Sequence, residues 1–420
     1  MNILYLHSHD TGRFIQPYGH AIPTPHLQQL AEEGVLFRQA FCAAPTCSPS
    51  RAALLTGQYP HSCGMLGLTH RGFAITDYGQ HLVQALKKHG FQTALAGVQH
   101  EAKPVDRIGY DQLLCPDRSQ AAQVAPAAVP FLEAKPQSPF FLAVGFSETH
   151  RVFPPAEADP RYCLPPAFLP DTPAVRADVA AFKTSARHMD NGVGRVLEAL
   201  QRTGLADDTL VISTTDHGIP WPSAKCTLTD QGIGVSLIMR GPGGFTGGKV
   251  VDALVSQIDL VPTICELLGI ERFPWLQGVS LLPALGGKEV RTEVFAEVTF
   301  HACYEPQRCV RTKRWKYIRF FDDYPALVAG NIDRSPSKTL WLEHGWKERP
   351  RAAEQLYDLV FDPGETNNLA GQQPEILRDL RARLDRWMRE TNDPLLNGPV
   401  PPPPGATITP REAVHPDGKP

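Results

Sequence analysis

Two residues that could do chemistry, Cys47 and Arg51, lie four positions apart in the segment CSPSR at residues 47–51. Pro has no amide hydrogen to lose and Ser caps a free amide, so both suit the first turn of a helix. We expect a helix over Ser50–Thr56, with Cys47 near its positive end, where an anion would be stabilised. Arg51 could present its rigid fork of donors to that anion. The alternative is a buried cysteine without a chemical role.

Four further polar segments could hold a metal ion or transfer protons. They are His9-Asp10, His100, His150 and Asp216-His217. Carboxylates and imidazoles are ligands for divalent cations, and a histidine can act as a general acid or base near neutral pH. Taken alone, a histidine after a strand is more often a loop residue than a ligand. Their joint placement in the fold therefore decides how these residues are interpreted.

Short apolar runs precede these segments, and longer helical patterns separate the runs. This alternation is typical of an α/β protein with a mostly parallel central sheet flanked by helices. We expect strands at Asn2–His7, Gln92–Val98, Phe140–Phe146, Thr209–Thr214 and Val235–Arg240. Helices are expected at Thr24–Glu33, Ser50–Thr56, Tyr78–His89, Val175–Arg202 and Gln257–Leu268. Because such sheets gather ligands beyond the carboxyl ends of their strands, the polar segments and Cys47 should meet at one edge.

The pattern of the sequence changes after residue 290. Val294–Phe300 and Cys309–Phe321 are typical of antiparallel strands, and Glu375–Thr391 has the amphipathic pattern of a helix. Residues 399–420 include a run of prolines at 401–404 and favour neither helix nor strand. We expect a catalytic domain over residues 1–290, an α+β subdomain over 291–398, and a Pro-rich tail over 399–420 that is disordered or wraps a partner subunit.

Bulk composition limits the partners and the location. The 420 residues are 42% hydrophobic and 20% charged, with a net charge of -3, which gives no reason to expect nucleic acid or an anionic membrane as a partner. Nine cysteines without paired spacing favour free thiols in a reducing compartment. No basic and apolar leader precedes the first strand, and no apolar run would span a bilayer, so we expect a cytoplasmic protein.

The string CSPSRAALLTG at residues 47–57 resembles the maturation site of the sulfatase family of the alkaline-phosphatase superfamily. In that family a formylglycine-generating enzyme oxidises the cysteine, and the hydrated formylglycine is the nucleophile. A thiol is a poor match for attack on sulfur, whereas one hydroxyl of a geminal diol can attack and its twin can later eject the product. The resemblance implies that Cys47 is modified and that Arg51 contacts the diol or the sulfo group.

The resemblance also implies a metal site. Asp10, Asp216 and His217 match ligand positions of sulfatases, and the modified Cys47 would complete them. His9 stands where the family has an aspartate, so whether it is a ligand stays open. The resemblance favours calcium, which prefers many oxygen ligands, whereas imidazole suits manganese or zinc. We expect one divalent ion, with calcium implied by the family and manganese and zinc as alternatives.

Three further residues match sulfatase positions for proton transfer and sulfo binding. His150 resembles the general acid toward the leaving group, and Lys225 resembles the Lys or Arg that contacts the sulfo group. His100 resembles the base that deprotonates the second hydroxyl of the diol. The lysine that the family carries two residues before this histidine is replaced by Val98. One positive contact to the sulfo group is therefore missing, unless Arg13 or another basic residue supplies it.

The likeness extends along the chain, and the segment WMRETNDP at residues 387–394 favours the sulfamidase-like branch of the family. We therefore expect a hydrolase that releases sulfate from an N- or O-sulfo group, with a small sulfated saccharide as substrate and a homodimer as the assembly. Six residues could frame the sugar, although packing or an interface is the stronger expectation for each alone. They are His70, Arg71, His301, Tyr304, Glu305 and Arg308.

Two other functions stay open. The first is a phosphonate monoester or phosphodiester hydrolase of the same superfamily, which the Asp216-His217 pair and a preference for manganese would suit. The second is a non-catalytic binding protein on the same scaffold, which the unusual His9 and Val98 suggest.

Overall fold

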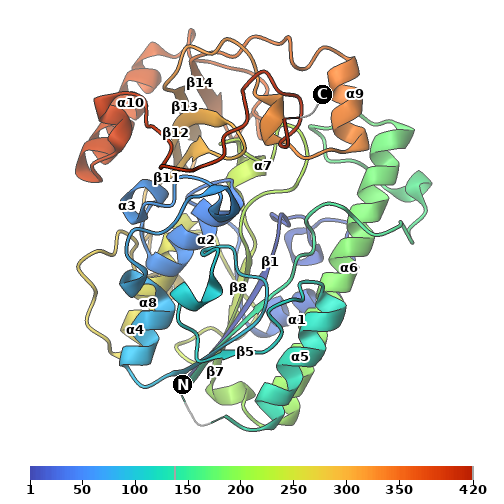
Figure 1. Cartoon of the computed structure of the whole chain (residues 1–420), viewed down its shortest axis with the longest axis vertical. Helices are drawn as coiled ribbons and strands as arrows, with labels where there is room; N and C mark the ends of the chain where they lie inside the picture. Colours follow the sequence, from blue (N-terminus) through green and yellow to red (C-terminus); the bar gives the residue numbers. More distant parts are fainter. Residues whose placement is uncertain (137–138, 419–420) are drawn as a thin grey trace.

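An eight-stranded sheet forms the centre of the molecule in the computed structural model, which describes residues 1–136 and 139–418 (Figure 1). Its strands are β1 (Asn2–Ser8), β2 (Val35–Phe37), β4 (Gln92–Gly97), β5 (Gln112–Leu113), β6 (Phe140–Gly145), β7 (Thr209–Thr215), β8 (Leu237–Arg240) and β9 (Lys249–Val251). Their order is β5-β4-β6-β1-β7-β8-β2-β9. β8 runs antiparallel to β7 and β2, whereas β4, β6, β1 and β7 are parallel. The predicted α/β fold with a mostly parallel sheet is confirmed.

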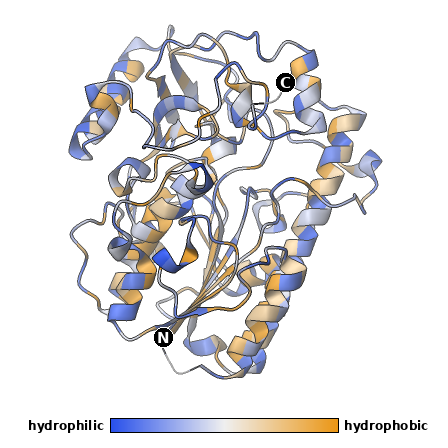
Figure 2. Ribbon diagram, in the orientation of Figure 1, coloured by the Kyte–Doolittle hydropathy of each residue, from blue (hydrophilic) through white to orange (hydrophobic). Residues whose placement is uncertain are grey.

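Helices cover both faces of this sheet. They are α1 (Pro25–Glu33), α2 (Cys47–Thr56), α4 (Leu82–Lys88), α5 (Ala121–Glu133), α6 (Pro173–Arg202) and α8 (Leu260–Leu268). Because alternate residues of a strand point to opposite sides, Leu4 and Leu6 of β1 pack with α1, α5 and α6. Ile3 and Tyr5 pack with α2, α4 and α8 on the other face. Figure 2 shows the central strands as predominantly hydrophobic, as burial on both faces requires.

Each predicted helix is present, but three begin three or four residues from the predicted start. α2 begins at Cys47 rather than at Ser50, because Thr46 is its N-cap residue and the proline of CSPSR fits inside the first turn. α4 begins at Leu82 rather than at Tyr78, because residues 78–80 form a separate 3-10 turn. α8 begins at Leu260 rather than at Gln257, because residues 257–259 form a 3-10 turn. A two-stranded sheet of β3 (Ala40–Phe41) and β10 (Val255–Ser256) lies outside the predictions.

A second sheet, of four antiparallel strands, follows residue 290. It comprises β11 (Glu293–Phe300), β12 (Tyr304–Thr312), β13 (Trp315–Phe320) and β14 (Glu354–Asp358), and α10 (Pro374–Glu390) packs on it. The single strand predicted over 309–321 is wrong. The chain reverses after Thr312 and forms β12 and β13, a turn without the Gly or Pro that would have marked it. Short helices α3 (Pro60–Cys63), α7 (Asp230–Ile233) and α9 (Pro336–Glu343) complete the elements that bear on the site.

The described part of the tail, residues 399–418, contains neither α-helix nor strand, as predicted. Its contacts are with its own chain. Thr407 donates its amide to the carbonyl oxygen of Arg71, and Thr409 donates to that of Ala302. The guanidinium of Arg71 in turn donates to the carbonyl oxygen of Pro416 at 2.6 Å. These bonds fix the tail beside the loop that follows α3.

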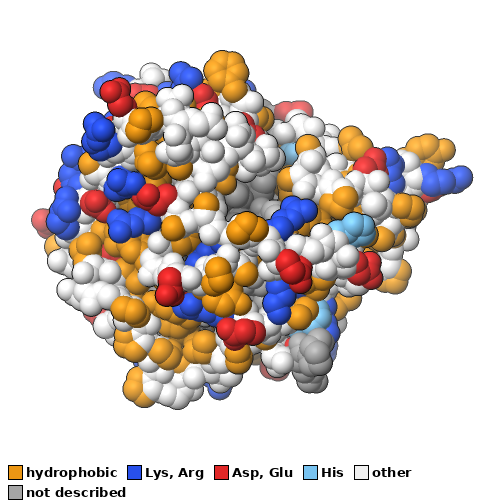
Figure 3. Space-filling view, turned by 90° about the horizontal axis from the view of Figure 1, so that it is seen from above, with side chains coloured by type: hydrophobic (Ala, Val, Ile, Leu, Met, Phe, Trp, Pro, Cys, Tyr) orange, Lys and Arg blue, Asp and Glu red, His pale blue; other side chains and the backbone are white. Residues whose placement is uncertain are grey.

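The surface seen from above mixes Lys and Arg with Asp and Glu, and hydrophobic side chains lie between them (Figure 3). Among the described residues, no helix combines the length and the apolar character that crossing a membrane requires. The predicted domain boundary at residue 290, the homodimer and the cytoplasmic location stay predictions.

Candidate active site

The polar segments predicted from the sequence meet at the carboxyl edge of the large sheet. Each follows one of four parallel neighbouring strands. The segment after β1 is His9-Asp10, after β7 Asp216-His217, after β4 His100 and after β6 His150. Because the ends of adjacent parallel strands lie side by side, residues remote in the sequence share one site.

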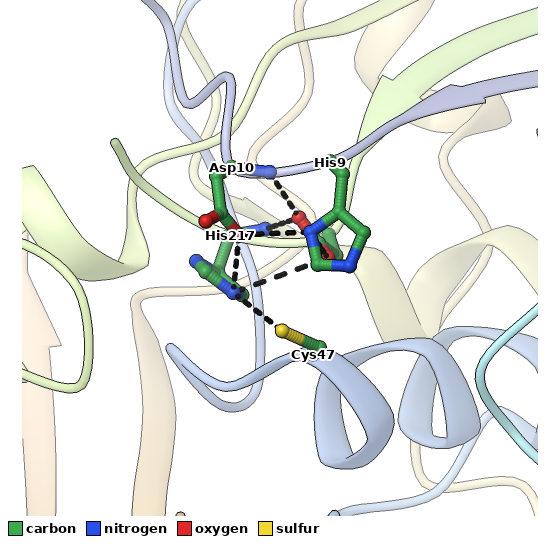
Figure 4. Close-up of side chains that lie close together, drawn as sticks. His9, Asp10, Cys47 and His217 are labelled. Atoms are coloured by element: carbon green, nitrogen blue, oxygen red, sulfur yellow. Dashed lines mark hydrogen bonds and ion pairs between the residues drawn. The ribbon is translucent and has the colours of Figure 1, made fainter. Parts of the chain in front are cut away.

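α2 brings Cys47 to the same edge. Cys47 lies in the first turn of the helix, where backbone N–H groups lack partners within the helix. It is 2% exposed, and its Sγ lies 3.4 Å from Nε2 of His217 (Figure 4). Burial raises the pKa of the Cys47 thiol well above its usual range. An unmodified cysteine here is therefore a neutral thiol at pH 7, which is a weak nucleophile.

Five buried residues form a cluster, which we call the edge cluster: His9, Asp10, Cys47, Asp216 and His217. Each offers one potential ligand atom, and these atoms all lie within 4.8 Å of one another. Nδ1 of His9 lies 2.9 Å from Oδ1 of Asp10 and 3.0 Å from Oδ2 of Asp216. Nε2 of His217 lies 3.1 Å from Oδ1 of Asp10. Figure 4 shows four of these side chains pointing toward one another.

The backbone of Asp10 is in the left-handed region, with a φ of 54°, which residues other than glycine rarely adopt. Hydrogen bonds that Asp10 and Thr11 donate to residues at the end of the neighbouring strand β7 hold it there. The amide of Asp10 donates to Oδ1 of Asp216 at 2.8 Å, and that of Thr11 donates to Oγ1 of Thr215 at 3.1 Å. Such strained residues concentrate at functional sites, where the surrounding structure maintains them.

Arg51 is buried behind the edge cluster. Its Nη2 lies 3.0 Å from Oδ2 of Asp216, and its Nη1 lies 2.6 Å from Nδ1 of His7. Burial and the neighbouring guanidinium lower the pKa of His7 well below its usual range, so the ring is neutral and accepts this hydrogen bond. Burial alone would raise the pKa of Asp216, but the two nearby histidines and Arg51 hold it below its usual range. The carboxylate is therefore ionised.

The donors of the edge cluster fit a divalent cation. Asp10 and Asp216 supply negative charge, and burial lowers the pKa of His9 to about 4, so its imidazole is neutral at pH 7 and able to act as a ligand. The set has more nitrogen than calcium prefers, because calcium takes oxygen ligands. The fit therefore holds for a divalent metal without fixing which one.

Lys225 connects the edge cluster to His150. Its Nζ lies 2.7 Å from Oδ2 of Asp10, 3.2 Å from Nε2 of His150 and 2.7 Å from Oδ2 of Asp333. Nδ1 of His150 lies 2.5 Å from the carbonyl oxygen of Arg151. Because a carbonyl can only accept, Nδ1 carries the hydrogen and Nε2 is left to accept from the lysine. The side chain of His150 is 32% exposed, so it lies where the site meets solvent.

His100 lies beside the edge cluster, with its ring centroid 6.1 Å from that of His9. Its Nε2 lies 3.0 Å from Nδ1 of His70, and the two rings are stacked. Burial lowers the pKa of His100 well below its usual range. A neutral imidazole in this position can take a proton.

Two basic residues that the sequence analysis considered do not face the cluster. Arg13, considered as a replacement for the lysine missing at Val98, donates to the carbonyl oxygen of Ala40 at 2.8 Å. Arg308, considered for sugar binding, is fully buried and pairs with Asp393. Among the described basic side chains, Arg51 and Lys225 are the Lys and Arg residues that pair with the carboxylates of the edge cluster.

Sequence reasoning missed Asp333 and His7. Asp333 lies 108 positions from Lys225, in a stretch without regular pattern, so no local signal could have linked the two. His7 is the penultimate residue of β1, and a polar residue near the end of an apolar strand was the signal available.

A family model described as Sulfatase matches residues 1–270, and one described as N-sulphoglucosamine sulphohydrolase, C-terminal, matches residues 222–338. The chain belongs to the sulfatase family, as its motifs predicted. It is 32% identical to the human N-sulphoglucosamine sulphohydrolase, over 95% of this chain and 92% of that protein. It is 28% identical to an ulvan-active sulfatase of Formosa agariphila, over 93% of this chain and 75% of that protein.

Solved structures share the fold. The chain superposes on a 2-O GAG sulfatase with a TM-score of 0.74, covering 96% of this chain and 95% of the other at 22% identity. At that level of identity the likeness bears on the fold alone. Both the central sheet and the antiparallel sheet after residue 290 are thus parts of the sulfatase architecture.

Proposed function

We propose that this protein hydrolyses a sulfate ester or a sulfamate of a small sugar and uses the mature form of Cys47 as nucleophile. One observation carries the proposal: Cys47 lies in the first turn of α2, inside a buried set of carboxylates and imidazoles. A helix N-terminus favours an anion, and Arg51 adds a positive charge behind it. The sulfo group would therefore be bound next to the nucleophile.

The sulfatase family and the burial of Cys47 together support a modified residue at this position. A buried neutral thiol is a weak nucleophile, and the family that the chain belongs to oxidises this cysteine, so we infer that Cys47 is converted to formylglycine. In the structure, Sγ stands for the oxygen atoms of the hydrated aldehyde. His9, Asp10, Asp216 and His217 would hold the metal together with that group. When bound, a divalent ion polarises the sulfo oxygens and stabilises the charge that develops on them.

The leaving group would depart on the side of His150 and Lys225. One hydroxyl of the diol loses its proton to solvent and forms a bond to sulfur, and the bond from sulfur to the sugar oxygen or nitrogen breaks. For this step His150 would first take up a proton from solvent at Nε2, which then no longer accepts from Lys225, and would pass that proton to the departing alcohol or amine. Lys225 keeps its positive charge near the sulfo group. Both side chains are already in mutual contact, with Nζ 3.2 Å from Nε2.

His100 would complete the cycle. It takes the proton from the second hydroxyl of the sulfated diol, the carbon–oxygen bond to the sulfate breaks, and the aldehyde is restored with release of sulfate. The low pKa that burial gives His100 keeps it in the basic form before this step. Water then rehydrates the aldehyde, and the proton leaves through solvent.

Sulfated saccharides are the substrate class that the relatives support. Their names include an N-sulphoglucosamine sulphohydrolase and a Delta 4,5-hexuronate-2-O-sulfatase. We infer that the substrate of this chain is a sulfated mono- or disaccharide. Both N-sulfo and O-sulfo sugars are therefore candidates for the experiment below. For the metal we infer calcium from the family, with manganese as the alternative that the imidazoles favour.

The decisive experiment uses protein co-expressed with a formylglycine-generating enzyme. Mass spectrometry of the Cys47 peptide should show the aldehyde in place of the thiol, and elemental analysis should show one divalent metal per chain. The protein should then release sulfate from N-sulfo or O-sulfo glucosamine, and it should cleave an aryl sulfate faster than the matched aryl phosphonate. Full conversion of Cys47 without turnover of any sulfated substrate would contradict the proposal, and a faster phosphonate reaction would favour the other hydrolase.

A further inference from the structure

We propose that Asp333 is a positioning residue for Lys225, which holds the lysine ammonium on the substrate side of the edge cluster. This inference rests on the proposed function, because it assigns Lys225 to the sulfo group. Asp333 reaches the site from the segment between β13 and α9, so the C-terminal part of the chain would take part in catalysis.

The three hydrogen-bond donors of Lys225 are all used. Asp10 and Asp333 each accept one through Oδ2 at 2.7 Å, and Nε2 of His150 accepts the third at 3.2 Å. An ammonium group has three such donors, so its position is set by these three acceptors together. Without Asp333, Asp10 would be the only carboxylate left, and the ammonium would be drawn toward a candidate metal ligand.

Charge balance supports a role for Asp333. With it, three carboxylates (Asp10, Asp216 and Asp333) face two basic side chains, Arg51 and Lys225. One bound divalent ion would leave a single positive charge, which matches the single negative charge of a sulfate monoester or a sulfamate. Burial alone would raise the pKa of Asp333, but Lys225 and His150 hold it below its usual range, so the carboxylate is ionised.

The segment that carries Asp333 is fixed on both sides. Nζ of Lys338 donates to the carbonyl oxygen of Ile332 at 2.5 Å and to that of Val414 in the tail at 2.6 Å. On the other side, the amide group of Asn331 donates to Glu305 at 2.9 Å and accepts from the amide of Cys303 at 2.8 Å. Hydrogen bonds therefore fix the backbone next to Asp333. A residue that positions another side chain needs such support.

A double-mutant cycle on the mature enzyme tests the inference. Asp333→Asn should lower kcat/KM by about 10- to 100-fold, the range expected for loss of one hydrogen bond between charged groups. Asp333→Glu should recover most of this loss because it restores the charge. In a Lys225→Met background, Asp333→Asn should add less than about threefold, because its effect passes through Lys225. Asp323→Asn, an exposed carboxylate of the same segment, is the matched control and should have no effect.

Binding of inorganic sulfate, measured by calorimetry on the same five variants, gives a readout independent of turnover. We expect the same pattern there: weaker binding in Asp333→Asn, recovery in Asp333→Glu and no further loss in the double variant. The inference would be overturned if the losses in kcat/KM or in sulfate affinity of the two single variants multiplied in the double variant. It would also be overturned if Asp333→Asn stayed within twofold of wild type in these quantities. A wild-type protein that binds sulfate but cleaves no sulfated substrate would contradict the proposed function instead. Thermal unfolding of each variant identifies any that fails to fold.

Discussion

Two buried clusters in this chain use the same residue types in different surroundings. The edge cluster combines two histidines, two aspartates and Cys47, with Arg51 behind it. The second, which we call the inner cluster, lies between α3 and β11 and consists of His61, Glu297, Asp393 and Arg308. Both hold carboxylates next to a histidine and an arginine. Only their access to solvent and their hydrogen bonds distinguish them.

The inner cluster is closed. Its side chains are at most 2% exposed, and the ring of His61 packs against Tyr59 and Trp387. Arg308 donates to both oxygens of Asp393 and, through Nη1, to the carbonyl oxygen of Val298. The guanidinium of Arg308 therefore supplies the positive charge that these carboxylates require. The cluster links the second sheet to the segment after α10.

The edge cluster is open on one side. His150 borders it and is 32% exposed, and Asp333 near the same side is 22% exposed. The cluster also includes the strained backbone of Asp10 and, through Cys47, the first turn of α2. A buried set of charges can act as a reaction site when a ligand can enter it. It has a structural role when side chains of the protein compensate every charge.

The largest expected effect concerns Cys47. Cys47→Ala should lower kcat on the order of 10⁴-fold or more, because it removes the nucleophile. Unfolding of the metal-free protein in urea should change little, since the substitution truncates a single small side chain. Cys265→Ala, at a buried cysteine of α8, is the control and should keep full activity. Turnover by Cys47→Ala within tenfold of wild type would contradict a catalytic edge cluster.

The inner cluster should respond in stability rather than in chemistry. Arg308→Ala should lower the free energy of unfolding by about 3–5 kcal/mol, because it leaves the buried carboxylates of Asp393 and Glu297 with His61 alone to balance them. Arg319→Ala, on the neighbouring strand, removes a pair whose side chains are 36% and 34% exposed and should cost less than about 1 kcal/mol. Urea unfolding measures both. Equal costs for the two variants would remove the distinction between the clusters.

Metal removal separates the clusters directly. Readdition of the bound metal to chelated protein, at about 100 times its dissociation constant, should raise the free energy of unfolding by about 2.7 kcal/mol. Asp216→Asn should abolish this response, whereas Glu297→Gln in the inner cluster should keep it. Thermal unfolding with and without calcium or manganese makes the measurement. The reverse pattern would place the metal in the inner cluster.

The smallest expected effect concerns His81, a buried histidine whose Nε2 has no hydrogen-bond partner in the described chain. Burial lowers its pKa to about 3. Between pH 6.5 and about 3 the unfolded chain therefore binds a proton that the native chain does not, and stability falls as the pH falls. The slope for one proton is about 1.4 kcal/mol per pH unit.

His81→Asn should remove this contribution and keep a side-chain acceptor for the amide of Val83, which His81 caps in α4. Its free energy of unfolding should then decrease less steeply from pH 7 to pH 5 than that of wild type. Parallel pH profiles for the two proteins would show that His81 does not titrate on unfolding.

Local patterns were sufficient for most of the fold. The strands that precede His9, His100, His150 and Asp216 were predicted within two residues, because each is an apolar run followed by a polar break. The turn after Thr312 was not predicted, since the alternation of β12 continues into β13 without a breaking residue. The start of α2 was placed three residues late, because a proline is compatible with several positions of the first turn.

The sequence by itself predicted the chemistry of Cys47 and Arg51, and it determined the carboxyl-edge position of the polar segments and membership of the sulfatase family. Each depends on residues close together in the chain or on a rule about parallel strands. Only the tertiary structure decided that Asp333 completes the surroundings of Lys225, that Arg13 lies elsewhere and that Arg308 belongs to a closed cluster. Such pairings join positions tens to hundreds of residues apart, and their energies depend on burial, which no local pattern encodes.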